Sequence, residues 1–331
     1  MELIRGIGPL APGGQESAVT IGNFDGLHLG HQALLRRLDS AAASESLRRI
    51  VLTFEPLPRE VFSPRPAQAN TSEAGTGLPN SKPRGTGTAC ARLMSLREKA
   101  AWLAASGLID ELRILRFNQA LAALPAEDFV RQILIERLHV RHVLIGDDFR
   151  FGHGRSGDFA LLARMGEEHG FTVEPTPQVM LDGERVSSTR VRGALVEGRL
   201  DDAARLLGRP YSLCARVTHG DKRGRLLGFP TLNLPLGRKH FALHGVYAVE
   251  ILGLADRPLP GVANAGIRPT VGGTVPRIEA HVFDWSGNAY GKRVEVRFRA
   301  FIREERKFAS LDDLTTQIAR DSEQARALTR S

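Results

Sequence analysis

The stretch that most constrains the fold is residues 18–43, where an apolar run leads through a glycine-rich turn into a helical pattern. Residues 18–24 are apolar and partly β-branched, and they predict a short buried strand. From His31 onward, leucine and alanine recur at steps of three and four residues, which predicts a helix. The turn between them holds three glycines and also His28. We therefore expect a strand–turn–helix unit near the start of the chain.

This turn has the chemistry of a phosphate site. Backbone amides and the dipole at a helix N-terminus attract anions. Imidazoles beside such a turn can donate hydrogen bonds to phosphate oxygens and stabilise charge that develops in a transition state. A glycine turn with a histidine is more often only a turn, and the spacing alone leaves that alternative open. No Gly-x-x-x-x-Gly-Lys-Ser/Thr string occurs in the chain, so the turn is not a P-loop.

The full string at residues 22–31, Gly-Asn-Phe-Asp-Gly-Leu-His-Leu-Gly-His, resembles the His-x-Gly-His signature of nucleotidyltransferases. Its form is similar to the version in bacterial FAD synthetases. The resemblance implies that His28 and His31 hold the phosphates of ATP during adenylyl transfer. It also implies ATP binding by four further residues of the string: Gly22, Phe24, Asp25 and Gly30.

Length and composition indicate a soluble protein of two domains. At 331 residues the chain is long for one domain and sufficient for two, each with its own core. No apolar run reaches the roughly 18 residues of a membrane span, and the N-terminus lacks a signal-peptide pattern. Two cysteines, Cys90 and Cys214, are too few for a disulfide framework or a metal cluster. We expect a cytoplasmic protein that does not contact membranes.

Charge is distributed unevenly along the chain. Residues 1–184 carry 20 basic and 22 acidic side chains, whereas residues 185–331 carry 25 basic and 15 acidic ones. This asymmetry suggests a polyanionic partner for the second half. Nucleic acid and a nucleoside triphosphate both fit that description, and charge alone does not distinguish them.

In the first half, strand patterns alternate with helical patterns. Strands are predicted at residues 49–54, 112–117, 140–145 and 171–174, and helices over 95–105, from 125 onward and within 157–170. This alternation implies right-handed crossovers and a parallel, Rossmann-like sheet. Ligands of such sheets lie at the carboxyl ends of the strands, where His28, Glu55 and Asp148 fall.

Residues 54–88 interrupt this alternation. Prolines in residues 54–62 predict a loop there, and Leu57 stands where the FAD synthetase family commonly has histidine. Leucine can neither donate a hydrogen bond nor carry charge, so we expect a weaker adenylylation rather than a different fold. Residues 68–88 are mostly Pro, Gly, Ser, Thr, Ala and Asn, and they cannot bury enough apolar surface to offset their ordering entropy. They are predicted to be a disordered insertion.

Two further strings resemble the nucleotide site of the same family: Asp-Phe-Arg-Phe-Gly at residues 148–152 and Val-Ser-Ser-Thr-Arg-Val-Arg at residues 186–192. The hydroxyls of the second string also suit a helix N-cap, with Ser188 or Thr189 capping a helix that ends near Gly198. Hydroxyls at a helix start beside arginines can hold a triphosphate as well. The resemblance implies ATP contacts from Asp148, Ser188, Thr189, Arg190 and Arg192.

From residue 211 the pattern changes to period two. Strands are predicted at residues 212–217, 246–252, 259–263, 278–285 and 294–302, without intervening helices. Consecutive strands of this kind suggest an antiparallel barrel. A closing helix is predicted after Ser310, whose spacing to Asp313 is typical of a capping box.

The segments between these strands carry chemistry. A basic glycine loop at residues 219–225 leads into Gly-Phe-Pro-Thr-Leu-Asn at residues 228–233, and a solvated hairpin loop is an equal alternative for the first segment. Thr231 and Asn233 alternate, so both side chains point to one face, where neutral oxygens suit Mg²⁺ that bridges substrate phosphates. The two segments together resemble riboflavin kinases. The resemblance implies ATP binding by Gly220, Lys222, Arg223, Gly224, Gly228 and Pro230, and Mg²⁺ binding by Thr231 and Asn233.

Glu279 lies on the strand pattern at residues 278–285 and faces away from Ile278. A lone strand glutamate is more often a surface residue. Its position matches the general base of riboflavin kinases, which would accept the proton of a ribityl hydroxyl as that oxygen attacks the γ-phosphorus of ATP. The resemblance further implies flavin contacts from Asn264, Arg268 and Arg303.

Five motifs thus follow the order found in bacterial bifunctional riboflavin kinase/FMN adenylyltransferases. The resemblance implies an α/β nucleotidyltransferase domain at residues 1–208 and an antiparallel β-barrel kinase domain with a terminal helix at residues 209–331. It implies Mg²⁺ and ATP as requirements, and riboflavin, FMN, FAD and pyrophosphate as substrates and products.

Two alternatives remain at the level of sequence. One is a kinase alone, with its first domain impaired at Leu57. The other is a nucleic-acid-binding protein that reuses the fold, which a pI of about 10.0 favours. No aromatic residues accompany the arginines in the way that single-strand binding requires, so we expect no nucleic-acid partner. The sequence does not predict the oligomeric state.

Overall fold

A computed structural model describes residues 1–6, 15–62, 91–220, 228–237, 241–270 and 273–329; side chains at 267–275 are not described. The chain divides into two compact units, Met1–Ser81 with Ser95–Val186 and Lys82–Met94 with Ser187–Ser331. Each unit contains a six-stranded sheet. The insertion predicted at residues 68–88 lies outside the described residues.

The first unit is built on a sheet in the order β1-β4-β3-β2-β5-β6, in which all neighbouring strands are parallel. These strands are β1 (Glu2–Arg5), β2 (Ser17–Ile21), β3 (Arg48–Glu55), β4 (Glu111–Arg116), β5 (Val140–Gly146) and β6 (Thr172–Thr176). From β2, the chain adds β3 and β4 toward one edge of the sheet, and it then adds β5 and β6 toward the other edge. The direction of winding therefore reverses between the neighbouring strands β2 and β5. A doubly wound sheet binds its ligand at such a switch point. The predicted parallel, Rossmann-like sheet is confirmed.

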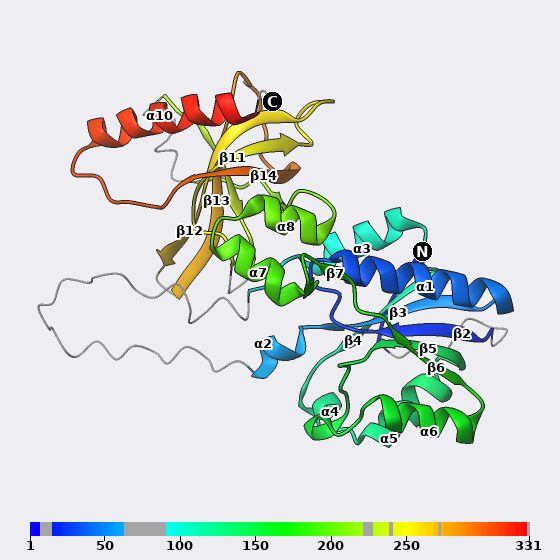
Figure 1. Cartoon of the computed structure of the whole chain (residues 1–331). Coiled ribbons are helices and arrows are strands. Elements are labelled where there is room, and N and C mark those ends of the chain that lie inside the picture. Colours follow the sequence, from blue (N-terminus) through cyan, green and yellow to red (C-terminus); the bar gives the residue numbers. More distant parts are fainter. Residues whose placement is uncertain (7–14, 63–90, 221–227, 238–240, 271–272, 330–331) are drawn as a thin grey trace, which may run out of the picture. The chain divides into compact units, whose positions relative to one another are not determined.

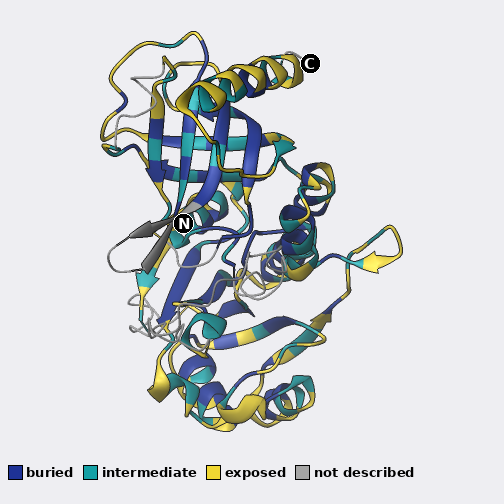
Figure 2. Ribbon diagram, turned by 90° about the vertical axis from the view of Figure 1, so that its left-hand side faces the viewer, coloured by how far each residue is buried: buried dark blue, intermediate teal, exposed yellow. Residues whose placement is uncertain are grey.

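Helices cover both faces of this sheet. Figure 1 shows α1 on one face and α4, α5 and α6 on the other. The helices are α1 (Leu29–Glu45), α2 (Pro58–Phe62), α3 (Leu96–Ser106), α4 (Gln119–Ala122), α5 (Ala126–Phe129), a π-helix at Val130–Ile135, a 3-10 turn at His153–Arg155 and α6 (Phe159–His169). Val19, Ile50 and Val143 are fully buried in the core between the layers. Strands β2 and β4 are buried along most of their length, and Figure 2 colours buried residues dark blue.

Local sequence signals define the ends of two predicted helices. Ser95 and Glu98 form a reciprocal capping box at the start of α3, and Gly107 ends the helix in the left-handed conformation. Asp158 caps α6, which ends at Gly170 in the same conformation.

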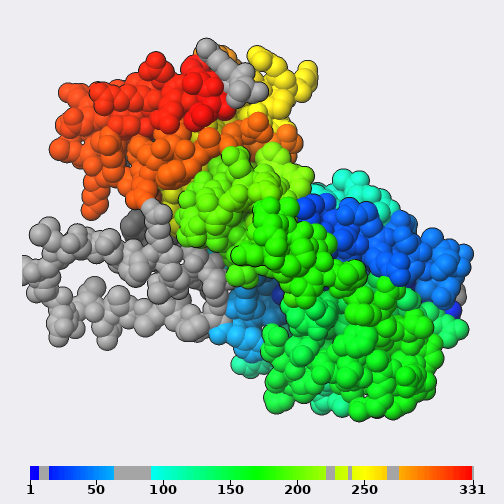
Figure 3. Space-filling view, viewed as in Figure 1, coloured from blue at the N-terminus to red at the C-terminus, as the bar shows by residue number. Residues whose placement is uncertain are grey.

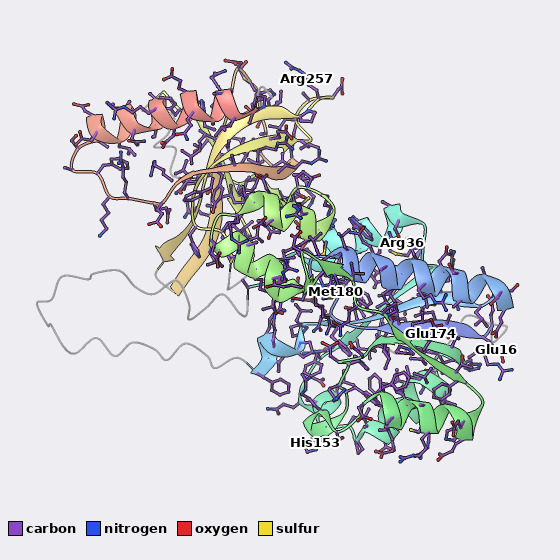
Figure 4. The ribbon with its side chains drawn as sticks, in the orientation of Figure 1. Glu16, Arg36, His153, Glu174, Met180 and Arg257 are labelled. Atoms are coloured by element: carbon purple, nitrogen blue, oxygen red, sulfur yellow. The ribbon has the colours of Figure 1, made fainter. Side chains whose placement is uncertain are left out.

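Glu174, labelled on β6 in Figure 4, accepts a hydrogen bond at 2.5 Å from Arg37 of α1. The edge strand is thereby tied to the first helix.

Several short elements were not expected from the pattern, among them α2, β1 and a short hairpin. The segment that the prolines predicted to be a loop contains α2, so that prediction is wrong at Pro58–Phe62. Proline is well placed at a first helical position, and Glu60 accepts a hydrogen bond from the Leu57 backbone N–H at 3.0 Å. The N-terminal strand β1 pairs with β4. The hairpin of β7 (Met180–Leu181) and β8 (Glu184–Arg185) precedes the predicted second nucleotide string.

The second unit is built on an antiparallel sheet in the order β10-β13-β12-β11-β14-β9. Its strands are β9 (Ser212–Arg216), β10 (Thr231–Pro235), β11 (Gly245–Leu252), β12 (Leu259–Thr270), β13 (Gly273–Val282) and β14 (Arg293–Arg303). A bridge between Thr218 and Asn233 joins the segment after β9 to β10. The two ends of the strand order therefore meet, which confirms the predicted barrel-like architecture.

The terminal helix α10 (Leu311–Thr329) packs on this sheet. Ser310 accepts a hydrogen bond from the Asp313 backbone N–H at 3.1 Å, so the predicted N-cap is confirmed. Ala325 is fully buried against a cluster that includes Val246 and Phe283. Figure 3 shows α10 in red beside the orange segments that precede it, on the outer surface of this unit.

Helices α7 (Ser188–Val196) and α8 (Leu200–Leu207) also belong to the second compact unit. The N-cap of α7 is Ser187, which accepts a hydrogen bond from the Arg190 backbone N–H at 3.2 Å, so the prediction of Ser188 or Thr189 as the cap is wrong. The predicted end near Gly198 is confirmed. A domain boundary at residue 208 stays a prediction, because packing groups both helices with the later residues. No described helix is both long enough and apolar enough to cross a membrane.

Candidate nucleotide and flavin sites

The predicted phosphate turn lies directly after β2, at the switch point of the first sheet. His28 is the N-cap of α1, and its Nδ1 accepts a hydrogen bond from the His31 backbone N–H at 3.4 Å. A neutral His28 therefore carries its proton on Nε2, which can donate to a ligand. A Cβ at Gly30 would lie 3.1 Å from the His28 ring, so glycine permits this cap. The start of α1 combines an imidazole donor with the positive end of a helix dipole.

His31 stacks on His28, with ring centroids 3.7 Å apart. The fully buried ring of Phe24 lies 5.1 Å from the His31 ring, and a Cβ at Gly22 would lie 3.2 Å from Phe24. Burial lowers the pKa of His31 well below its ordinary value, and the nearby His28, Lys99 and Arg185 lower it further. Its Nδ1 is buried and has no hydrogen-bond partner among the described residues. His31 is therefore a neutral imidazole with an unused polar atom.

Lys99 of α3 is a residue of this site that the sequence analysis missed. It is 2% exposed, and its Nζ donates to the Asn23 carbonyl oxygen at 2.6 Å and to Thr53 Oγ1 at 3.0 Å. Asn23 belongs to the glycine turn, so a buried cation fixes the backbone of that turn. A lysine on the apolar face of a predicted amphipathic helix is the sequence signal that could have identified it.

Asp148, predicted to contact ATP, lies just beyond β5 on the other side of the switch point. Arg185 of β8 donates to its Oδ1 at 2.8 Å. This hydrogen bond is the main reason why the pKa of Asp148 is lowered and that of Arg185 is raised. Arg185 was also missed, although it stands directly before the predicted string at residues 186–192. Its guanidinium brings positive charge toward His31.

Asp25 of the same turn is buried and paired with Arg59 of α2, whose Nη2 lies 2.5 Å from Asp25 Oδ2. The carboxylate therefore links the turn to α2. Leu57, the departure from the family pattern, is 2% exposed and contributes to the apolar interior. The predicted ATP contact of Asp25 stays a prediction.

The remaining predicted ATP contacts of this domain lie in the second compact unit. Ser188 and Thr189 are the first two residues of α7, directly after the N-cap. Arg192 is buried, and its Nε donates to the Ala91 carbonyl oxygen at 2.7 Å. Arg190 is partly exposed. The predicted ATP contacts of these residues stay predictions.

The predicted metal ligands of the second unit lie on β10. Residues Thr231 and Asn233 alternate with the buried Leu232 and Leu234, so both side chains lie on the more exposed face. Asn233 Nδ2 donates to Thr218 Oγ1 at 2.9 Å and to the His219 carbonyl oxygen at 3.2 Å. The amide oxygen of Asn233 accepts a hydrogen bond from Arg277 Nη1 of β13 at 3.3 Å.

Glycine at position 220 leaves room for the Asn233 side chain. A Cβ at Gly220 would lie 3.1 Å from the Cβ of Asn233. A larger residue would press on the predicted ligand. Gly228 has a positive φ of 82°, and the Pro230 carbonyl oxygen lies 2.9 Å from His281 Nδ1. Lys222, Arg223 and Gly224 lie outside the described residues.

Glu279 of β13 lies in one row with two other predicted site residues. Strand register pairs it with Asn233 of β10 on one side and with Asn264 of β12 on the other. Asn264 Nδ2 donates to Glu305 Oε1 at 2.8 Å, and Asn264 Oδ1 is buried without a partner among the described residues. Arg277, which the sequence analysis missed, donates from Nη1 to Glu279 Oε1 at 2.9 Å. The barrel brings these polar groups to one face.

Of the two remaining predicted flavin residues, Arg303 has a described side chain and Arg268 does not. Arg303 at the end of β14 forms a two-point ion pair with the buried Asp321 of α10, with its Nη2 2.7 Å from Asp321 Oδ2. Its guanidinium carbon also lies 5.7 Å from the centre of the Phe308 ring. Arg268 lies on β12, and its side chain is not among those that the structure describes.

A phosphate-directed turn at the switch point of a parallel sheet, together with hydroxyl, amide and carboxylate groups on a separate barrel, defines a nucleotide-dependent transferase with two sites. The family described as FAD synthetase matches residues 12–190, and the family described as riboflavin kinase matches residues 207–329. The chain belongs to the family of bifunctional riboflavin kinases/FMN adenylyltransferases, as its similarity to curated members over nearly its full length shows.

Three curated proteins named bifunctional riboflavin kinase/FMN adenylyltransferase illustrate this similarity. The protein of Escherichia coli strain K12 is 46% identical over 98% of this chain and 97% of its own length. The Pseudomonas fluorescens protein is 44% identical over 99% and 98%, and the Haemophilus influenzae protein is 42% identical over 99% of each chain. A crystal structure titled macrolide-efflux protein from Streptococcus pneumoniae has a TM-score of 0.78 and 28% identity, covering 98% of this chain and 99% of that chain.

Proposed function

We propose that this chain makes FAD from riboflavin in two steps, each of which consumes ATP. Residues 209–331 phosphorylate riboflavin to FMN, and residues 1–208 adenylylate FMN with release of pyrophosphate. The observation that carries the proposal is the presence of two separate constellations, the His28–His31 turn on the parallel sheet and the Asn233–Glu279 row on the barrel. The similarity to bifunctional relatives supports the same pair of reactions. Use of ATP and the two cysteines support a cytoplasmic location.

In the adenylylation step, a phosphate oxygen of FMN attacks the α-phosphorus of ATP. The bond from that phosphorus to the bridging oxygen breaks, and pyrophosphate leaves. His28 and the start of α1 donate toward the negative charge that develops, and His31 extends this imidazole surface. Catalysis of this kind is mainly positioning and charge stabilisation. Triphosphate binding is proposed for Gly22, Phe24, Asp25, Gly30, Asp148, Ser188, Thr189, Arg190 and Arg192.

In the kinase step, Glu279 accepts the proton of the ribityl hydroxyl as its oxygen attacks the γ-phosphorus of ATP. Asn264, Arg268 and Arg303 are proposed to bind the flavin, and Gly220, Lys222, Arg223, Gly224, Gly228 and Pro230 to bind ATP. Thr231 and Asn233 fit Mg²⁺, because a hydroxyl and an amide oxygen are hard ligands and the amide nitrogen is already bonded elsewhere. When bound, Mg²⁺ neutralises phosphate charge and leaves most of its coordination to water and substrate.

The first test is incubation of the purified protein with riboflavin, ATP and Mg²⁺, followed by chromatographic separation of the flavins. We expect both FMN and FAD. Accumulation of FMN without FAD would support a kinase alone and would point to Leu57 as the lesion. Absence of any flavin product would contradict the proposal.

Single substitutions separate the two sites. Glu279→Ala should lower FMN formation by at least about 100-fold, because a general base contributes roughly 10²–10⁴ to a rate. The same variant should convert supplied FMN to FAD at the wild-type rate. His31→Ala should show the opposite pattern. If Glu279→Ala forms FMN at the wild-type rate, Glu279 is not the general base.

A further inference from the structure

Arg277 occupies a special position on the face of the barrel that carries Glu279. It precedes Glu279 by two residues on β13, so both side chains lie on the same face of the strand. Its neighbours across the sheet are Pro235 of β10 and Gly266 of β12, and neither offers a polar side chain. Among the described residues, its guanidinium hydrogen-bonds to side chains of the adjacent row.

The contacts of Arg277 converge on the proposed base and the proposed metal ligand. Its Nη1 donates to Glu279 Oε1 at 2.9 Å and to Asn233 Oδ1 at 3.3 Å. The Arg277 side chain is 17% exposed, whereas the Glu279 side chain is 43% exposed. The more buried side chain thus holds one oxygen of the more exposed carboxylate. Glu279 Oε2 accepts no hydrogen bond from a described residue.

We propose that Arg277 is a positioning residue of the kinase site, which fixes the Glu279 carboxylate through Oε1 and leaves Oε2 for the substrate hydroxyl. The inference rests on the proposed role of Glu279 as base. In the step concerned, the ribityl O–H proton passes to Oε2 and the oxygen forms a bond to the γ-phosphorus. The bond between that phosphorus and the β,γ-bridging oxygen breaks, and ADP leaves.

A guanidinium suits this role because it remains charged and donates in a fixed plane. An unrestrained glutamate on a strand samples several rotamers, and misplacement of a base by about 1 Å can cost 10²-fold in rate. The second contact, to Asn233, sets the carboxylate relative to the proposed metal ligand. Asn233 Oδ1 has two lone pairs, so this contact leaves one of them available.

The test uses the full-length protein and the variants Arg277→Met, Arg277→Lys and Glu279→Gln, with FMN formation as the assay. Arg277→Met should lower kcat about 10- to 100-fold and change the KM for riboflavin by less than about threefold. Arg277→Lys should retain more than about a third of kcat, because an ammonium can also donate to Oε1. A kcat for Arg277→Met within about twofold of wild type would overturn the inference, as would equal losses in both Arg277 variants.

Two further measurements separate positioning from a structural role. Binding of Mg²⁺-ADP by calorimetry should differ by less than about threefold between wild type and Arg277→Met, and a loss that parallels kcat would overturn the inference. In the double variant, kcat for FMN formation should be less than about threefold below that of Glu279→Gln alone, because both residues act through one carboxylate. A kcat loss in the double variant equal to the product of the two single losses would overturn the inference.

The chain offers a matched control in Arg297, which donates to Glu295 Oε1 at 2.9 Å with the same two-residue spacing on β14. Arg297→Met should keep kinase kcat within about twofold of wild type, and FAD formation from supplied FMN should be normal in every variant. The outcomes also separate the two proposals. Normal kcat in Glu279→Gln would refute the base assignment, whereas an inactive Glu279→Gln with a normal Arg277→Met would refute only the role of Arg277.

Discussion

At the scale of single residues, burial changes the protonation of His31, a residue of the proposed phosphate site. Its imidazole stacks on His28 and lies at a tilted angle beside the buried Phe24, and burial is the main cause that keeps its pKa low. A neutral ring does not need a permanent counter-ion. It can approach a polyphosphate as a hydrogen-bonding group, while Lys99 and Arg185 supply positive charge close by.

This lowered pKa predicts a pH dependence of stability. The unfolded chain takes up a proton on residue 31 near the ordinary histidine value of about 6.5, whereas the folded protein does so only at lower pH. The contribution of neutral His31 to the free energy of unfolding is therefore fully present above a pH of about 6.5, and it is lost as the pH falls from there toward the lower pKa of the folded protein. We expect the free energy of unfolding of the wild type to decrease more steeply between about pH 7 and pH 5.5 than that of His31→Asn.

Denaturant unfolding at a series of pH values measures this difference. The other histidines are present in both proteins, and all of them except His28, which stacks on His31, contribute equally to the two profiles. Parallel pH profiles for the wild type and His31→Asn would show that His31 titrates normally in the folded protein.

At the scale of elements, α3 connects a helix face to the chemistry of a loop from another part of the chain. Its reciprocal cap at Ser95 fixes where the helix starts and hence where Lys99 projects. The Lys99 ammonium then bonds the backbone of the glycine turn and the side chain of Thr53 on β3. The element therefore positions the phosphate turn without contributing to its sequence motif.

Substitution of Lys99 by methionine should impair adenylylation selectively. Methionine preserves much of the apolar stem but leaves the Asn23 carbonyl and the Thr53 hydroxyl without this donor, at a cost of about 1–3 kcal/mol for a buried group. We expect the rate of FAD formation from FMN to fall at least about tenfold. Riboflavin phosphorylation in the same preparation should be unchanged.

The exposed Lys292 of the second unit provides a control for removal of a lysine charge. Lys292→Met should leave both activities within about twofold of wild type. If FAD formation by Lys99→Met is also normal, the glycine turn keeps its geometry without the buried cation, and the role assigned to α3 is wrong.

At the scale of the whole molecule, the two proposed reactions are assigned to residues around two different sheets. The proposed phosphate turn lies at the switch point of the parallel sheet, and the proposed kinase residues lie on one face of adjacent antiparallel strands. FMN is the product of one reaction and the substrate of the other. It must therefore leave the kinase site before its phosphate can attack ATP.

This requirement predicts complementation between inactive variants. His31→Ala supplies FMN and Glu279→Ala converts it, so a mixture of the two should form FAD from riboflavin, ATP and Mg²⁺ although neither does so alone. The rate should rise with the concentration of both proteins, because free FMN carries the intermediate. A mixture that accumulates FMN without FAD, when Glu279→Ala alone converts supplied FMN, would contradict transfer through solution.

Much of the fold could be predicted because its signals are local. The period change near residue 211, the capping residue Ser95 and the αL glycines at positions 107 and 170 each act over a few neighbouring residues. The exception near α7 is instructive. Three successive hydroxyl residues precede or begin that helix, and local preference alone does not determine which one caps it.

The sequence by itself determined the strand–helix alternation of the first half, the antiparallel pattern of the second and the residue types of both motifs. Only the tertiary structure decided that Lys99 fixes the turn at Asn23, that Arg185 pairs with Asp148 and that Arg277 reaches Asn233. These partners are 76, 37 and 44 residues apart. Periodicity reports which face of an element is apolar, but strand order and register decide which distant polar groups come within hydrogen-bond distance.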